Sequence, residues 1–158
     1  MTKQIALTMG YVALVDDEDY EKVSKHKWYA TKHYGHSDRI YAAREVNGKT
    51  VKMHSFITGY KITDHIEGNG LDNRRCNLRE CTNAENQRNR GATKHNRLGF
   101  KGVTKRVGGR GIKRFRARIR VDYNLIHIGD YLTAEEAARA YDDAAKKHFG
   151  NFAWTNFK

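Results

Sequence analysis

Apolar and charged side chains alternate along residues 114–121, which read Arg-Phe-Arg-Ala-Arg-Ile-Arg-Val. Successive side chains of a β-strand point to opposite faces, so the pattern predicts a strand with one apolar and one cationic face. The apolar face needs a cover, because leaving it in water would be unfavourable. The cationic face carries Arg114, Arg116, Arg118 and Arg120.

A helix predicted over residues 133–148 can supply that cover. Thr133 and Glu136 form a capping box at its start, and Gly150 is a typical stop signal after its end. A stripe of mostly small residues at helical spacing would permit close approach to a sheet. The stripe consists of Ala137, Ala140, Tyr141, Ala144 and Ala145.

Two more strand-like segments, residues 100–106 and 125–131, lie on either side of the alternating strand. The glycine-rich residues 108–111 and the Asp-Tyr-Asn-Leu residues 122–125 are expected to separate the strands. The pattern predicts a three-stranded antiparallel sheet packed on one C-terminal helix.

Residues 3–60 contain further, shorter segments typical of strands and of a helix, so the predicted fold class is α+β. Residues 16–25 place acids first and bases last, as a helix dipole favours, and Asn47-Gly48 is a typical hairpin turn. We interpret these small N-terminal strands and helix as a scaffold; a DNA-contacting platform is the alternative. The strand-like segments are residues 5–7, 11–15, 28–31, 39–46 and 50–53.

Charge narrows the choice of partner. The 158 residues include 30 lysines and arginines against 18 aspartates and glutamates, a formal net charge of +12. Such an excess favours nucleic acid, and residues 86–121 contain no acidic side chain at all. We expect an intracellular protein without membrane insertion, because the chain has neither a long apolar run nor an apolar N-terminal segment.

Two cysteines, Cys76 and Cys81, are five residues apart and form no Cys-x-x-Cys motif. Reduced structural thiols are the preferred interpretation. A disulfide, or a zinc site completed by scattered histidines, remains as an alternative.

Residues 63–90 concentrate the side chains suited to phosphodiester chemistry. Asp64 and His65 end a β-prone run, residues 60–66, and a turn-rich segment follows. Thr82 and Glu85 form a second capping box, so a helix should begin there and carry Asn86 in its first turns, facing Asp64. Asn77 can fix the turn and the imidazole through hydrogen bonds to the backbone.

Hydrolysis of a phosphodiester needs a base and a positive charge near the phosphate. His65 can take a proton from water near neutral pH. Asp64 and Asn86 supply hard oxygen donors, which suit Mg²⁺ or Mn²⁺.

Asp64-His65, residues 68–75, Asn77-Leu-Arg and the Thr82-x-x-Glu-Asn86 segment resemble an HNH endonuclease of the phage and intron homing type. The resemblance implies a ββα-metal motif at about residues 60–90, with one divalent ion per active site. His65 would be the general base, Asp64 and Asn86 the metal ligands, and Asn77 structural. Asn86 in the last position marks the H-N-N variant. His54 would support the site or bind phosphate; a packing role is the alternative.

Residues 98–157 resemble the ethylene-response-factor (Apetala-type) DNA-binding domain, through Phe100-Lys-Gly-Val, residues 115–120, Ile128-Gly-Asp-Tyr and residues 133–142. In that family a three-stranded sheet lies in the major groove. The plant domain's tryptophan pair is missing here, and a nonspecific clamp is the alternative. The implied DNA contacts are Lys101, Thr104, Arg106, Arg114, Arg116, Arg118 and Arg120.

The two resemblances predict an HNH endonuclease domain at residues 1–90, a basic linker at 91–97 and a DNA-binding domain at 98–158. The predicted function is site-selective, metal-dependent cleavage of double-stranded DNA, without an obligate protein partner. A phage or mobile element acting in bacterial cytoplasm is the expected source. The alternative is a DNA-binding transcription regulator with an inactive HNH scaffold.

Overall fold

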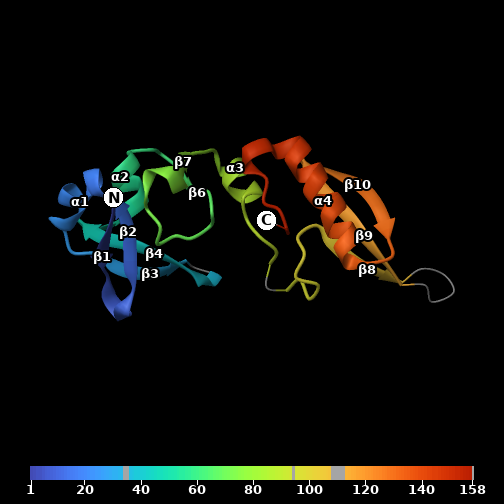
Figure 1. Ribbon diagram of the computed structural model, residues 1–158, viewed down its shortest axis with the longest axis horizontal. Helices are drawn as coiled ribbons and strands as arrows, with labels where there is room; N and C mark the ends of the chain where they lie inside the picture. Colours follow the sequence, from blue (N-terminus) through green and yellow to red (C-terminus); the bar gives the residue numbers. More distant parts are fainter. Residues whose placement is uncertain (34–35, 94, 108–112, 158) are drawn as a thin grey trace. The chain divides into compact units, whose positions relative to one another are not determined.

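The computed structural model describes residues 1–33, 36–93, 95–107 and 113–157, which form a mixed α+β protein with several small sheets (Figure 1). The chain divides into two compact units, Met1–Asn86 and Gln87–Lys158, and each is described by itself. No helix among the described residues is long and apolar enough to cross a membrane.

The first unit begins with the antiparallel pair β1 (Thr2–Ala6) and β2 (Val12–Asp16), followed by α1 (Asp17–Ser24). Acidic residues fill the first turn of α1, where the helix dipole favours them. β2 and α1 fall on the predicted segments, whereas β1 begins three residues before the predicted strand at residues 5–7.

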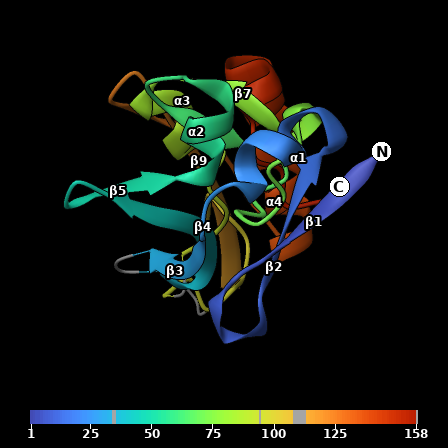
Figure 2. The ribbon, with the colours of Figure 1, turned by 90° about the vertical axis from the view of Figure 1, so that its left-hand side faces the viewer.

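A second antiparallel sheet has the order β3-β4-β5, with β3 at Tyr29–His33, β4 at His36–Val46 and β5 at Lys49–Lys52 (Figure 2). Asn47 and Gly48 join β4 to β5 with φ angles of 50° and 71°. Positive φ at both positions matches the right-handed twist of a hairpin, as the sequence predicted. The short helix α2 (Met53–Thr58) follows directly and ends at Gly59.

The core of this unit joins both sheets to α1 and α2. Trp28 is buried in it and donates a hydrogen bond from Nε1 to the Val23 carbonyl, at 2.9 Å. Met53 is completely buried. The other buried apolar residues are Ile5, Ala13, Val15, Val23, Ala42, Ile57 and Leu78.

The hairpin that carries Asp64 and His65 is short. Strand β6 covers Thr63–His65, pairs antiparallel with β7 (Leu78–Glu80), and is followed by α3 (Asn83–Arg88). The predicted strand at residues 60–66 is therefore too long. The order β6, β7, α3 agrees with the predicted succession of two strands and a helix.

The loop between β6 and β7 is tied to the N-terminal elements. The Leu14 amide donates to the Leu71 carbonyl, and the Asn73 amide donates to the Leu14 carbonyl, both at 2.8 Å. Nε and Nη2 of Arg75 each donate a hydrogen bond to one oxygen of the buried Asp19 carboxylate. The N-terminal part therefore supports the loop, which is the scaffold role expected for it.

The second unit contains the antiparallel sheet β10-β9-β8, with β8 at Val103–Val107, β9 at Lys113–Val121 and β10 at Asn124–Tyr131. Helix α4 (Ala134–Phe149) lies along one face of the sheet (Figure 1). Its Thr133–Glu136 capping box is present, and Gly150 caps its end. The core contains Val103, Ala117, Ile119, Ala137, Ala138, Tyr141 and Ala145.

Three details of this unit differ from the prediction or lie beyond it. Strand β8 begins at Val103 rather than residue 100, because Gly102 has a φ of 78° that an extended strand does not allow. Ala138 is fully buried on α4, whereas Ala140 is only half-buried. The turn predicted at residues 108–111 lies outside the described residues.

Candidate functional site

Asp64 faces Arg79 across the β6–β7 pair. Nη2 and Nε of Arg79 lie 2.6 Å and 3.0 Å from the same carboxylate oxygen, Oδ2. The Asp64 side chain is only 6% exposed, so its negative charge depends on this partner. Arg79 was not among the predicted site residues, because only strand pairing places it opposite Asp64.

His65 is buried and packs against two other rings. The ring centroids of His65 and His54 are 4.9 Å apart at a nearly perpendicular angle, and Tyr41 is 5.7 Å from His65. Burial lowers the pKa of His65 to about 4; the Asn73 side chain and the Asp72 carboxylate oppose the shift. The imidazole is therefore neutral at pH 7, which is the form that can accept a proton.

His54 lies in α2, 6% exposed. Burial lowers its pKa to about 3, and the nearby His65 and Lys52 add to the effect. Among the described residues its Nδ1 has no hydrogen-bond partner. An unsatisfied buried nitrogen is unfavourable for stability, so the fold alone does not account for a histidine here.

Asn77 closes the loop that follows His65. Its Oδ1 accepts from the Glu67 amide at 2.9 Å, and its Nδ2 donates to the Asp72 carbonyl at 2.8 Å. Asp72 is itself held by Arg74, whose Nε and Nη2 donate to the two carboxylate oxygens. Asn77 thus fixes the loop through backbone contacts, the type of hydrogen bond inferred from its position.

Asn86 lies in the first turns of α3. The helix starts as predicted, since Thr82 and Glu85 exchange both bonds of a capping box. The backbone N–H of Asn86 donates to the Thr82 carbonyl at 3.0 Å, and Asn86 is half-buried. Cys76 is exposed and Cys81 is buried, and both are free thiols that form no disulfide. No three His, Cys, Asp or Glu side chains are grouped for metal binding within the described ranges.

A hard divalent cation fits the chemistry of Asp64 and Asn86. Both offer oxygen, and Mg²⁺ is commonly held by one or two protein carboxylates with water and phosphate completing its shell. Arg79 already neutralises Asp64, which weakens the attraction of the site for a cation before substrate arrives.

The cationic face of β9 is partly neutralised within the second unit. Arg116 contacts both carboxylate oxygens of Asp130, at 2.8 Å and 3.0 Å, and Arg106 and His127 each approach Asp130 to 3.3 Å. The hydrogen bonds from Arg116 hold the pKa of Asp130 well below its usual range. The carboxylate therefore stays charged and keeps these cations oriented.

The other predicted DNA contacts have different surroundings. Arg118 lies 3.5 Å from the Thr104 hydroxyl, Arg114 is half-buried, and Arg120 is exposed. Lys101 donates from Nζ to the Arg88 carbonyl at 2.6 Å. The structure thus gathers most of the set on one sheet face but places Lys101 against the last residue of α3.

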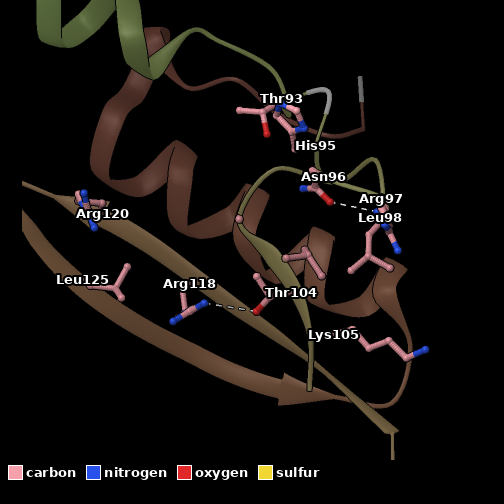
Figure 3. Close-up of a pocket in the computed structure, with 12 residues that line it drawn as sticks. Thr93, His95, Asn96, Arg97, Leu98, Thr104, Lys105, Arg118, Arg120 and Leu125 are labelled. Carbon is pink, nitrogen blue, oxygen red and sulfur yellow. Dashed lines mark hydrogen bonds between the residues drawn. The ribbon is translucent and has the colours of Figure 1, made fainter. Parts of the chain in front are cut away.

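A groove of about 910 Å³ lies between Thr93 with residues 95–98 and this sheet face (Figure 3). The sequence pattern predicted a basic linker at residues 91–97 but did not predict that some of these residues line this groove. The absence of acidic residues from this stretch pointed to a contact with an anionic partner. The charged and polar lining includes Thr93, His95, Arg97, Lys105, Arg118 and Arg120.

Comparisons with known proteins identify the family of this chain. No family model matches the chain. An uncharacterized HNH endonuclease of Acanthamoeba polyphaga mimivirus is 30% identical over 157 residues, covering 93% of this chain and 75% of the relative. The chain therefore belongs to the HNH endonuclease family. Dehydration-responsive element-binding protein 2A of Arabidopsis thaliana is 37% identical over 68 residues, which cover 43% of this chain and 20% of the plant protein.

Proposed function

We propose that this protein is a metal-dependent, site-selective endonuclease of the homing type that hydrolyses phosphodiester bonds in double-stranded DNA. The observation that carries the proposal is His65, a buried neutral imidazole next to Asp64 on a two-stranded hairpin followed by a helix. His65 would accept a proton from the attacking water. Asn77 would keep the loop in place.

Asp64 and Asn86 are proposed to hold one Mg²⁺ or Mn²⁺ ion. When bound, such an ion neutralises charge on the phosphate and on the leaving oxygen. Arg79 is proposed to orient Asp64, and His54 is proposed to support His65.

The second unit is proposed to hold the DNA. Its sheet face and groove present cations that can neutralise phosphates, and the plant relative's name describes an element-binding protein. Phosphate contacts would give affinity and base contacts would give selectivity. The proposed contact residues are Lys101, Thr104, Arg106, Arg114, Arg116, Arg118 and Arg120.

One observation favours the alternative of a DNA-binding regulator with an inactive nuclease scaffold. Asp64 is buried and already paired with Arg79, so a metal ion must share it. A supercoiled-plasmid nicking assay separates the two functions. The endonuclease requires nicking with Mg²⁺ or Mn²⁺, loss of nicking with EDTA, and loss in His65→Ala and Asp64→Ala at unchanged DNA affinity.

DNA binding without any metal-dependent nicking would favour the regulator. Activity restored by Zn²⁺ alone would contradict the proposed oxygen-ligand site.

A further inference from the structure

Lys52 ends β5 and is half-buried, with its Nζ 4.6 Å from the centre of the Tyr41 ring. Across the described part of the chain, no carboxylate forms an ion pair with this ammonium group. Burial lowers the pKa of Lys52. The aromatic face compensates only part of the lost hydration, so the site favours an anion beside Nζ.

Tyr41 connects this ammonium group to the nuclease residues. Its ring centre lies 5.7 Å from that of His65 and 5.8 Å from that of His54. The charge of Lys52 also lowers the pKa of His54, so the two groups lie within electrostatic range of each other. Gly70 lies close against the ring, since a Cβ there would overlap Tyr41.

We propose that Lys52 is the anion site of the nuclease and binds a non-bridging oxygen of the phosphate to be cut. The inference rests on the proposed function and adds a catalytic residue to it. During hydrolysis the water oxygen bonds to phosphorus and its proton passes to His65. The bond to the leaving oxygen breaks, and this oxygen keeps the electron pair and takes a proton from solvent. Negative charge grows on the phosphate oxygens in this step, and a fixed cation stabilises it.

Arg79 cannot take this role while it is paired with Asp64. The neutralised Asp64 also leaves the phosphate with less repulsion from the protein. Lys52 thus brings to this ring cluster a cation that has no carboxylate partner among the described residues.

The test compares Lys52→Met with Lys49→Met in the plasmid-nicking assay with Mg²⁺. Lys49 is an exposed lysine of the same strand, so its variant controls for the loss of one positive charge. Lys52→Met should lower kcat about 100-fold and change KM less than about threefold. An effect of this size is typical when an enzyme loses one group that stabilises charge in the transition state. Lys52→Arg should recover part of kcat, and Lys49→Met should resemble the wild type.

Thermal unfolding of each variant separates catalysis from folding. If Lys52→Met does not fold, Lys52→Gln gives the same comparison with a polar neutral end. Nicking by a folded neutral variant within about twofold of the wild type would overturn the Lys52 site alone. Absence of nicking by the wild type would instead overturn the proposed function.

Discussion

Arg79 binds the Asp64 carboxylate, with Nη2 at 2.6 Å and Nε at 3.0 Å from Oδ2. Both side chains are largely buried, so each removes the cost of the other's unpaired charge. The pair therefore links the stability of the hairpin to the charge state of the proposed metal ligand.

Arg79→Met should lower the free energy of unfolding by about 3–5 kcal/mol, because it leaves the Asp64 charge buried without its partner. Added Mg²⁺ should restore part of this loss by binding the Asp64 carboxylate in place of Arg79. Urea unfolding with and without Mg²⁺ measures both effects. Lys25→Met is the control, since its ion pair with Glu21 is solvent-exposed and should contribute little. An Arg79→Met variant as stable as the wild type would show that the ion pair does not support the fold.

Acidification should destabilise the protein through His54. Its folded pKa is about 3, against an ordinary value of 6.5, so the unfolded chain binds the proton first. The stabilising contribution is complete above about pH 6.5 and is lost as the pH falls toward 3, at up to about 1.4 kcal/mol per pH unit. His54→Phe should flatten part of this dependence in urea unfolding at pH 7, 6 and 5, because buried His65 contributes a similar one. Equal slopes in both proteins would mean that the pKa of folded His54 is ordinary.

Replacing His54 also tests whether stability is given up for activity. His54→Phe keeps a ring in the cluster and removes the unsatisfied Nδ1, so stability at pH 7 should stay equal or rise by about 1–3 kcal/mol. Plasmid nicking should fall if the imidazole supports His65. A variant that is less stable and still fully active would assign His54 to packing.

Gly102→Ala should destabilise the second unit more than Gly99→Ala. Both glycines have positive φ, 78° and 74°, which costs about 1–2 kcal/mol for a residue with a Cβ. A Cβ at Gly99 meets open space, whereas one at Gly102 would overlap the Tyr141 ring and add about 1–3 kcal/mol. The difference between the two variants in thermal unfolding isolates the overlap. Equal losses would indicate that the Tyr141 ring moves aside freely.

Asp130→Asn should increase the affinity for duplex DNA of any sequence, because it releases Arg116 and Arg106 for phosphate contacts. Fluorescence anisotropy over a salt series should show a steeper dependence of log Kd on log salt, by about 0.9 for each added phosphate contact. Asp143→Asn is the control, because it changes the net charge equally at an exposed position of α4. It should change the DNA affinity less. Equal gains in the two variants would mean that only net charge matters.

Local patterns predicted much of the fold. The alternation in β9, both capping boxes and the Asn47–Gly48 turn each depend on neighbouring residues, and all are present. Side chains brought together by tertiary packing could not be predicted in this way. The Arg79 and Lys52 contacts, and the approach of Asp130 to Arg116, depend on strand register and on loops packed against distant strands.

The hydrogen bonds between Leu14 and the β6–β7 loop also have a consequence for the order of folding. A pair of three-residue strands is too short to persist alone, and closing the chain from residue 14 to residue 73 is slow compared with forming local turns. The nuclease loop should therefore become ordered only after β1 and β2 have paired. On the proposed function, a chain in which β1 and β2 are still unpaired would therefore lack an ordered site for cutting.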